Sequence, residues 1–456
     1  MNYQDFIESK RSSKPPEFRD LEYRPSQLFP FQEYLVSWAL GQSRSAIFAD
    51  TGMGKTLQQL TWAVNVNKFT DKPVLILAPL IVTFQTEKES EKFGIDGVSV
   101  SRDGTIKSPI IVTNYEQLPK FDWSDFGGVV CDESGILKSF SGEIRTSIIQ
   151  FMRKVPYRLL CSATPAPNDF VELGNSSEAL GIMGYRDMLS KYFTNGRDNT
   201  SERRHYGKAP EWQFRGHSEK PFWKWVSQWS RIVRKPSDLG FADDNYCLPS
   251  LNINHLKIEA GAPEGMLFAL PAVKLDEQKA ETKRTIPERV EMVSHCVSGN
   301  DSFISWCNLN AESSALKKAL GDDAVEISGS DKDDDKIAKV KDFVEGNVRG
   351  LITKPKIGAW GLNFQHCHHM TYFPNHSYEQ WYQSVRRCWR YGQQNDVTVD
   401  VVYTPGEQRI LDNMIDKTRK AENMYSQLVA NMSTSAKIEY STQSKTQQRE
   451  VLPSWL

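Results

Sequence analysis

Several features that would place the chain in a membrane or outside the cell are missing from this sequence. None of its apolar runs approaches the ~18 residues that are needed to span a bilayer. The seven cysteines are odd in number and scattered, and Cys131 and Cys161 fall in apolar runs typical of strands, which favours reduced thiols over a disulfide framework. The N-terminal stretch is polar and unlike a signal peptide. We therefore expect a soluble, cytoplasmic protein with no membrane partner.

A strong charge of either sign is also missing. The net charge is −1, although 25% of the residues are charged. This neutral total neither favours nor excludes nucleic acid, because local patches decide such binding. With 456 residues, of which 39% are hydrophobic, the chain is long enough for about two to four domains with cores of their own.

A glycine-rich turn between a strand pattern and a helix pattern is the strongest signal that is present. The apolar run at 45–48 predicts a strand, and the run at 57–64 predicts a helix. Between them lies Ala49-Asp50-Thr51-Gly52-Met53-Gly54-Lys55-Thr56. Such a turn cradles phosphates with backbone N–H groups at a helix N-terminus. We predict that Lys55 reaches the β- and γ-phosphates of a nucleotide and that Thr56 holds Mg²⁺.

A second signal is an apolar strand that ends in two carboxylates. Val129-Val130-Cys131 is followed by Asp132 and Glu133. In a parallel sheet this pair lies at the carboxyl edge, where ligands bind. We predict that Asp132 contributes to the Mg²⁺ site through water and that Glu133 polarises the attacking water.

Apolar strand patterns alternate with helix patterns from 26 to about 165, and again after about 290. This alternation predicts parallel sheets covered on both faces. In the second region, Gln383, Arg387 and Arg390 stand at i, i+4 and i+7. If they lie on one helix they share a face, and the two arginines suit transition-state charge on a γ-phosphate. The run Ser162-Ala163-Thr164-Pro165 is a weaker signal, because it also fits an ordinary strand end.

Together these motifs resemble those of superfamily-two helicases, and within them the Swi/Snf-type DNA translocases. Gln32 looks like the family's adenine-reading glutamine, and 49–56 resembles the family's phosphate loop, which tolerates a residue other than Gly at its first position. Residues 132–138 parallel the Asp-Glu-Ala-His box, although Ser134-Gly135 replaces Ala-His. Gly361 belongs to a match to the fifth motif at 358–363, and 383–393 is close to the specific sixth motif, QxxxRxxRxGQ.

The resemblance implies an α/β fold with two RecA-like parallel-sheet domains, as in P-loop NTPases, in tandem with a helical insertion between them. It implies MgATP as the ligand and nucleic acid, most of all double-stranded DNA, as the partner of a monomer, in the host cytoplasm if the protein is viral. The expected domains are a flexible lead at 1–25, a first RecA-like domain at 26–170, a mostly helical insertion at 171–290, a second RecA-like domain at 291–430 and a polar tail at 431–456. The chain looks like a minimal bacterial or bacteriophage member.

The insertion carries basic and aromatic residues together. Nine Lys/Arg lie among four tryptophans between Arg203 and Lys235, a mixture that suits a nucleic-acid groove. However, Phe222, Val226, Trp229 and Val233 follow a helical period. We therefore expect Trp225 and Trp229 to be core residues and the basic side chains on the other face to be the DNA candidates. The run at 366–369, which holds three histidines and a cysteine, lacks a second ligand pair at zinc spacing, so local packing is favoured there.

Three functions remain open from the sequence. The first is an ATP-dependent DNA translocase, that is, a nucleic-acid-stimulated ATPase that moves along duplex DNA. The second is a helicase that separates strands of DNA or RNA. The third is a nucleotide-gated DNA-binding module with little turnover, which the replacement of His by Gly135 would favour.

Overall fold

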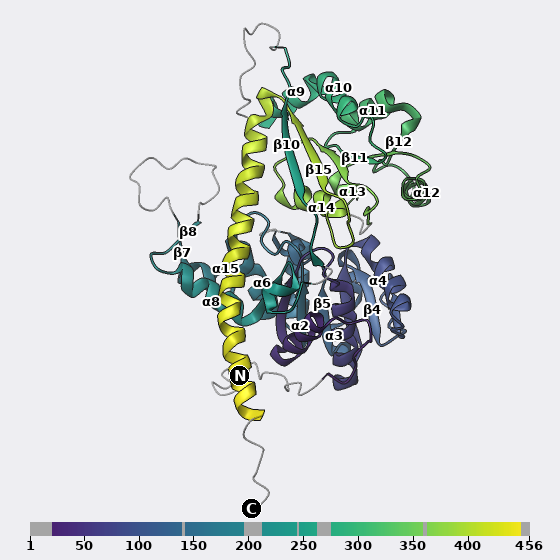
Figure 1. Ribbon diagram of the computed structural model, residues 1–456. Helices are drawn as coiled ribbons and strands as arrows, with labels where there is room; N and C mark the ends of the chain where they lie inside the picture. The colour runs from purple at the N-terminus through teal and green to yellow at the C-terminus, as the bar shows by residue number, and fades with distance from the viewer. Residues whose placement is uncertain are drawn as a thin grey trace, which may run out of the picture. The chain divides into compact units, whose positions relative to one another are not determined.

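The computed structural model describes residues 21–138, 142–195, 212–243, 246–261, 275–358 and 363–447. The chain forms two compact units, which are described separately. Unit 1 contains Met1–Asp243 and Asn423–Leu456, and unit 2 contains Asp244–Glu422. Each unit is built on a sheet with helices around it (Figure 1). Across the described ranges, no helix has both the length and the apolar character that a membrane crossing requires.

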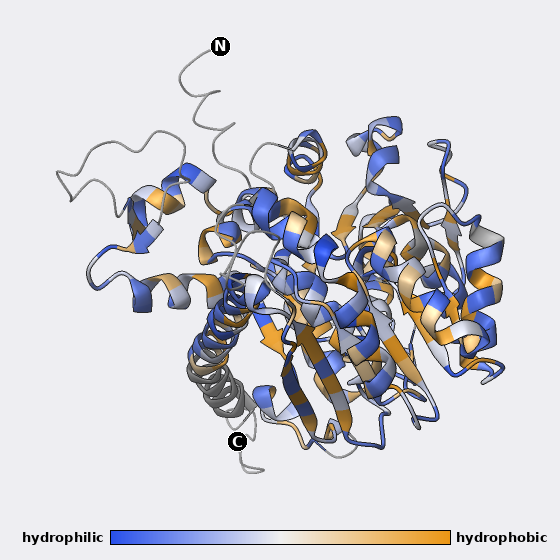
Figure 2. Ribbon diagram, turned by 90° about the horizontal axis from the view of Figure 1, so that it is seen from above, coloured by the Kyte–Doolittle hydropathy of each residue, from blue (hydrophilic) through white to orange (hydrophobic). Residues whose placement is uncertain are grey.

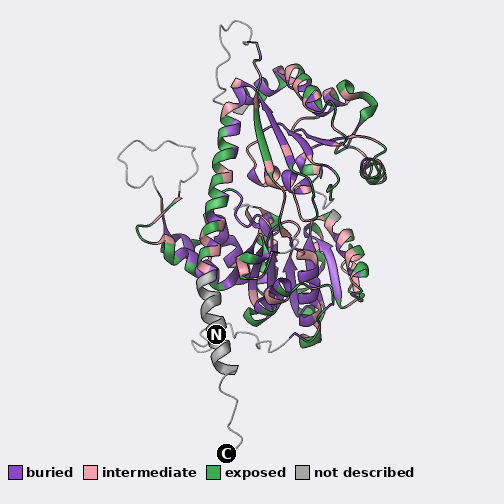
Figure 3. Ribbon diagram, in the orientation of Figure 1, coloured by how far each residue is buried: buried purple, intermediate pink, exposed green. Residues whose placement is uncertain are grey.

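Unit 1 is built on a seven-stranded parallel sheet with the order β3-β4-β2-β5-β6-β1-β9. The strands are β1 (Arg44–Ala49), β2 (Val74–Ala78), β3 (Val98–Val100), β4 (Ile110–Asn114), β5 (Gly128–Cys131), β6 (Tyr157–Cys161) and β9 (Ser230–Val233). Every residue of β2, β4, β5 and β6 is buried (Figure 3), and apart from Thr113, Asn114 and Arg158 their residues are apolar or glycine. Figure 2 shows hydrophobic residues along the strands. The apolar runs therefore identified the central strands correctly.

Helices and one small hairpin complete unit 1. The helices are α2 (Pro30–Gln42), α3 (Lys55–Thr70), α4 (Leu80–Lys92), α5 (Glu143–Met152), α6 (Leu173–Leu180), α7 (Tyr185–Tyr192) and α8 (Glu219–Trp229). The antiparallel hairpin pairs β7 (Phe193–Asn195) with β8 (Trp212–Phe214). Helix α3 packs so closely on β5 that a Cβ on Gly128 would lie 2.7 Å from Val66 and 3.2 Å from Trp62. Glycine at the start of β5 thus permits this helix–sheet contact.

Unit 2 is built on a six-stranded parallel sheet with the order β10-β15-β14-β11-β13-β12. Its strands are β10 (Leu251–Lys257), β11 (Phe303–Trp306), β12 (Ala324–Glu326), β13 (Gly350–Thr353), β14 (His369–Tyr372) and β15 (Val397–Tyr403). Its helices are α9 (Leu275–Arg284), α10 (Ile286–Cys296), α11 (Asn310–Leu320), α12 (Asp333–Val344), α13 (Pro355–Gly358) and α14 (Tyr378–Cys388). Two parallel sheets, each with its own helices, confirm the predicted α/β class with two RecA-like domains.

The segments around and after the expected insertion take part in these sheets and cores. Strand β9 adds to the sheet of unit 1 and β10 to that of unit 2, although both come from 171–290. Helix α15 runs over Gln408–Gln447, so it includes the stretch 431–447 of the predicted polar tail. Its residues Met424, Leu428 and Met432 are buried in the core of unit 1. The remaining domain boundaries stay predictions.

A buried charge cluster joins three helical segments of unit 2. Arg289 on α10 is fully buried, with Nη1 at 2.7 Å from Glu312 Oε1 and at 3.6 Å from Glu407 Oε1. Its Nη2 donates to the carbonyl of Thr282. Burial raises the pKa of the Glu407 carboxyl, while the charge of Arg289 acts in the opposite direction. The arginine thus compensates two carboxylates that have left water.

We expect Arg289→Met to be strongly destabilising, because it leaves buried carboxylates without their cation. Breaking one side of a buried ion pair costs about 3–5 kcal/mol. The thermal unfolding midpoint of the full chain measures this. Arg349→Met is the matched control, since its ion pair with Asp323 is exposed at 38% and 58% and such pairs contribute about 0–1 kcal/mol. Equal shifts of the midpoint in the two variants would contradict the expectation.

Candidate functional site

The predicted phosphate loop connects β1 to α3 in unit 1. Gly52 and Gly54 have φ values of 90° and 76°, in the left-handed region that favours glycine. The Lys55 ammonium donates to the carbonyl of Ala49 at 3.0 Å, so the lysine folds back over the loop. The backbone N–H of Thr51 donates to Asp50 Oδ1 at 2.6 Å. The loop therefore has the shape that exposes backbone donors at a helix N-terminus.

Gln32 on α2 lies directly against this loop. Its side chain is 2% exposed, and its Nε2 donates to the carbonyl of Met53 at 2.9 Å. A Cβ on Gly54 would lie 2.2 Å from the same Nε2, so only glycine fits at this position. Gln58 Nε2 donates to the Met53 carbonyl as well, at 2.8 Å. Two glutamines thus hold the loop, and the adenine-reading role of Gln32 stays a prediction.

The carboxylate pair lies at the same edge of the sheet as the loop. Strand β6 separates β5 from β1, so Asp132 follows a strand that is two places away from the loop. Asp132 Oδ1 accepts a hydrogen bond from Gln59 Nε2 at 2.6 Å. Burial raises the pKa of Asp132, while the positive charge of Lys55 and the Gln59 hydrogen bond act to lower it. The charge of Lys55 therefore acts on Asp132 within one unit, as a shared site requires.

Glu133 adopts an unusual backbone conformation. Its φ is 44°, in the left-handed region that non-glycine residues rarely occupy. The 3₁₀ helix η3 (Ser134–Lys138) begins directly after it. Strained residues of this kind cluster at functional sites, where the surrounding structure holds them in place. The conformation turns the chain sharply at the expected water-polarising residue.

Small hydroxyl side chains at the end of β6 lie between the loop and the carboxylates in the strand order. The N–H of Thr164 donates to Ser162 Oγ at 3.0 Å. The hydroxyls of Thr164 and Ser134 are buried and have no hydrogen-bond partner within the described part of the chain. Buried polar groups are normally satisfied, so these orphan hydroxyls fit an edge that receives a polar ligand. With Thr56 half-exposed at the start of α3, the residues present fit MgATP.

Sequence reasoning missed the glutamines of α3. Gln58 and Gln59 are 0% and 1% exposed, whereas the sequence pattern predicts only that they belong to a helix. Their signal was available in the sequence, because polar residues on the buried side of a helix need specific partners. Here those partners are the phosphate loop and Asp132.

The predicted arginine motif lies in unit 2 on and after α14. Arg387 is in the last turn of the helix and is half-buried, as is Gln383. Arg390, however, lies beyond the helix, which ends at Cys388 because Trp389 takes φ −85° and ψ 81°. The expectation that all three side chains share one helical face is therefore corrected for Arg390. It is held by the following turn instead.

Hydrogen bonds fasten this turn to the segment that follows the fifth motif. The N–H of Phe364 donates to the Arg387 carbonyl at 3.0 Å, and Gln393 Nε2 donates to the Cys367 carbonyl at 3.0 Å. The Arg390 guanidinium donates to Asn363 Oδ1. Gly361 lies outside the described residues. The two arginines are therefore positioned by contacts from both motifs.

Arg386 differs from its neighbour Arg387 in its surroundings. It is 3% exposed, and its guanidinium lies 4.8 Å from the Trp389 ring and donates to the Trp389 carbonyl at 3.1 Å. These contacts make Arg386 a packing residue of the turn. The half-buried Arg387 and Arg390 remain the candidates for contact with a ligand.

The aromatic helix α8 is largely a core element. Trp225 and Trp229 are 8% and 3% exposed, which confirms the core prediction. The Arg231 guanidinium stacks 4.1 Å from the Trp38 ring, and that of Arg234 lies 3.8 Å from the Tyr425 ring. The exposed basic residues of the segment are Arg215, Lys220, Lys224 and Lys235, while Arg203, Arg204 and Lys208 lie outside the described residues. DNA contact by this segment stays a prediction.

The histidine-rich run in unit 2 packs between strands. His369 Nε2 lies 2.9 Å from Asp400 Oδ2, and Cys367 is buried. Among the residues that the structure describes, no group of three or more His, Cys, Asp or Glu is arranged to hold a metal ion. The contact with Asp400 joins β14 to β15.

No family model matches the sequence. A putative protein p41 of Acyrthosiphon pisum secondary endosymbiont phage 1 is 30% identical over 169 residues, which cover 32% of this chain and 37% of the phage protein. The DNA annealing helicase and endonuclease ZRANB3 of Bos taurus is 25% identical over 227 residues, which cover 44% of this chain and 20% of that protein. The chain thus matches only a minor part of either relative.

Two solved structures also resemble the chain. The Sulfolobus solfataricus SWI2/SNF2 ATPase core in complex with double-stranded DNA has a TM-score of 0.43 and 14% identity, covering 92% of this chain and 97% of that one. The Mycobacterium smegmatis helicase Lhr, bound to single-stranded DNA and AMP-PNP, has a TM-score of 0.49 and 15% identity, covering 87% and 48%. The order of its motifs and its two parallel sheets are similar to those of Swi/Snf-like helicases of superfamily two, and ZRANB3 is among its sequence relatives.

Proposed function

We propose that the protein is a nucleic-acid-stimulated ATPase that hydrolyses ATP to ADP and phosphate to move along duplex DNA. The observation that carries this proposal is the edge of unit 1, where the phosphate loop, Lys55 and Asp132 meet. Their geometry and the effect of the Lys55 charge on Asp132 suit a nucleotide with its Mg²⁺. When bound, Mg²⁺ neutralises negative charge on the phosphates. Thr56 and Asp132 would hold it.

The site residues have distinct roles in this proposal. Glu133 orients and polarises the attacking water, and Lys55 contacts the terminal phosphates. Arg387 and Arg390 of unit 2 stabilise charge on the γ-phosphate in the transition state. Because hydrolysis removes that phosphate, the arginines bind the ATP state and the ADP state differently, which couples chemistry to conformational change.

The proposal predicts that nucleic acid accelerates ATP hydrolysis. The rate is measured with double-stranded DNA, single-stranded DNA and RNA in parallel, and duplex DNA should stimulate most. Contact through phosphates should make the half-saturating DNA concentration rise steeply with salt, by about 10³-fold between 50 and 200 mM for about six contacts. An ATPase rate that no nucleic acid changes would refute the proposal.

Two further assays, triplex displacement and unwinding of a forked duplex, distinguish translocation along duplex DNA from strand separation. A translocase on duplex DNA displaces the third strand of a triplex without opening a forked duplex. Unwinding of the fork would favour the strand-separating helicase. A negligible ATPase rate together with ATP-dependent DNA binding would favour a nucleotide-gated binding module.

A further inference from the structure

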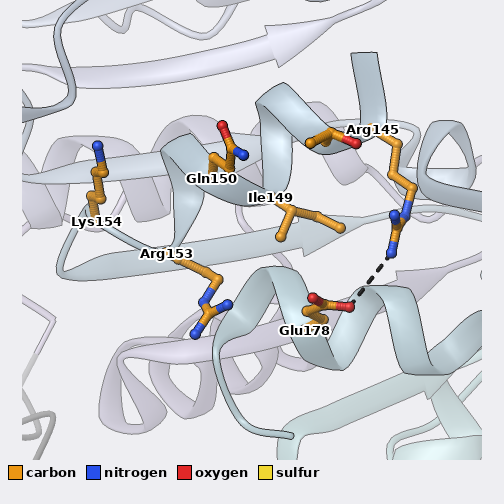
Figure 4. A pocket seen from close by; sticks show the side chains of 7 residues that line it. Arg145, Ile149, Gln150, Arg153, Lys154 and Glu178 are labelled. Atoms are coloured by element: carbon orange, nitrogen blue, oxygen red, sulfur yellow. Dashed lines mark hydrogen bonds and ion pairs between the residues drawn. The ribbon is translucent and has the colours of Figure 1, made fainter. Parts of the chain in front are cut away.

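A basic groove lies on unit 1 between α5 and α6. It encloses about 530 Å³ and is lined by Arg145, Arg153, Lys154 and Glu178, together with Ile149 and polar side chains of α5 (Figure 4). Arg145 and Arg153 are eight residues apart on α5 and its C-cap, which corresponds to roughly 12 Å along a helix. In Figure 4 they extend toward α6 from the two ends of this face. We call this cavity the α5–α6 groove.

One end of the groove lies away from the nucleotide edge within unit 1. The other end does not, because Arg145 Nη2 donates to Asn175 Oδ1 and Asn175 Nδ2 donates to the carbonyl of Leu137 in η3, both at 2.9 Å. Arg153 and Lys154 stand just before β6, at the amino edge of the sheet, whereas the phosphate loop and Asp132 follow carboxyl ends of strands. Arg44 and Arg158, the paired residues at the amino ends of β1 and β6, carry further positive charge at this edge. The end at Arg153 and Lys154 therefore belongs to a basic region that the candidate nucleotide site does not use.

Positive charge at this edge is poorly compensated. The buried Arg158 donates to the carbonyls of Val155, Leu180 and Arg153 at 2.7, 2.7 and 2.5 Å. It makes no ion pair with any described residue. Burial lowers its pKa to about 9, and the neighbouring charges of Arg44 and Arg153 act in the same direction. An anion bound nearby would relieve this repulsion.

Among the described residues that line the groove there is one carboxylate, that of Glu178, and it already has partners. Glu178 Oε2 accepts from Arg145 Nη2 and from the N–H of Tyr185, both at 3.4 Å. Arg153 and Lys154 are exposed, and neither forms an ion pair with a described residue, although Lys154 Nζ lies 5.3 Å from the centroid of the Trp123 ring. The groove thus has cations available to a ligand with at least two negative charges.

The lining favours phosphates over an acidic protein segment. Within the part of the chain that the structure describes, Ile149 is the single apolar residue lining the groove, and it is 5% exposed. Protein partners need apolar or aromatic anchors in pockets, whereas nucleic-acid interfaces are polar and strongly basic. Guanidinium groups bind phosphate oxygens in a bidentate way. Arg153 and Lys154 are the exposed cations for this contact, whereas the Arg145 side chain is 15% exposed and already bonded to Glu178 and Asn175.

We propose that the α5–α6 groove binds the sugar-phosphate backbone of nucleic acid as a second contact, separate from the nucleotide edge. This inference deepens the proposed function, because it rests on nucleic-acid binding, but it does not depend on ATP hydrolysis. Such a contact carries no base readout, so it raises affinity for all sequences alike.

The test compares Arg153→Gln/Lys154→Gln with the full-length wild type. Binding to a short fluorescent duplex is measured without nucleotide at several salt concentrations. Loss of two phosphate contacts should make the slope of log K against log[salt] shallower by about 2. Lys318→Gln/Lys341→Gln removes the same charge from exposed positions of unit 2 and should leave the slope unchanged. Thermal midpoints confirm that both variants fold.

Two outcomes overturn the inference. One is a wild-type salt slope in Arg153→Gln/Lys154→Gln. The other comes from a competition assay. In it, poly-glutamate would displace the duplex from the wild type more effectively than inorganic phosphate or a DNA strand of equal charge does. In Arg153→Gln/Lys154→Gln, poly-glutamate would lose this advantage. That result would assign the groove to an acidic protein segment. The ATPase rate at saturating DNA is measured separately. If DNA does not stimulate hydrolysis, the proposed ATPase function fails; if the salt slope of DNA binding is unchanged in the variant, the proposed groove contact fails.

Discussion

Glu133→Gln should bind ATP and fail to turn it over. The substitution keeps the shape of the side chain but removes the carboxylate that polarises the attacking water. General-base catalysis contributes about 10²–10⁴-fold, so the DNA-stimulated rate should fall by that order while ATP affinity is retained. Single-turnover hydrolysis and equilibrium binding of ATP measure the two quantities independently.

The control for this prediction is Glu143→Gln, which neutralises an exposed glutamate in the first turn of α5. It should retain the wild-type rate. If Glu133→Gln hydrolyses ATP as fast as this control, Glu133 is not the base. A loss of ATP binding in Glu133→Gln would instead indicate that the left-handed backbone at φ 44° depends on the carboxylate, and that the residue is structural.

The nucleotide half of the site was predictable from local sequence. A strand, a glycine-rich turn and a helix are defined by neighbouring residues, and so is a buried strand that ends in Asp132-Glu133. Which strands lie next to each other is a property of the whole sheet. The position of β6 between β5 and β1 therefore came only from the structure, and with it the place of Thr164 between the loop and the carboxylates.

Other parts escaped prediction for physical reasons that can be named. In α15 the buried residues Met424, Leu428 and Met432 recur every four positions, but polar neighbours dominate the composition of the segment. Composition predicts a polar tail at 431–456, which includes Met432 but not Met424 or Leu428, and the shared helical period of the three residues is seen only in the structure. Strand β9 is four residues long and directly follows α8, so its pairing with β1 depends on contacts far away in the sequence.

The position of Arg390 shows that residue spacing alone does not prove that residues share a helical face. Spacings of i, i+4 and i+7 share a face only while the helix continues. Here it ends at Cys388, and Gly392 at φ 91° completes the turn. A glycine soon after a helical pattern signals such an end, so the sequence contained the information that the helix stops early.

Arg386 and Arg387, which are consecutive at the end of α14, are expected to have different roles. Arg387→Ala should lower the DNA-stimulated ATPase rate by about 10³-fold or more, the order expected when an arginine stops stabilising transition-state charge. Nucleotide affinity should change far less, because the contact is strongest in the transition state. Arg387→Lys should not rescue the rate fully, since an ammonium cannot replace the planar guanidinium fork. The turnover rate and the Kd for a non-hydrolysable ATP analogue are measured for each variant.

Arg386→Ala is the internal comparison, because the two side chains are neighbours in sequence but differ in burial. Removing Arg386 deletes its stacking on Trp389 and its hydrogen bond, so it should lower the thermal midpoint, with a cost of about 2 kcal/mol for a desolvated cation–π contact. Arg387→Ala should leave the midpoint close to wild type. The opposite result would be loss of turnover in a stable Arg386→Ala protein, together with an Arg387→Ala protein that is destabilised but active. That result would assign the nucleotide contact to Arg386 and the packing role to Arg387. Stability and rate together therefore decide which guanidinium acts on the nucleotide.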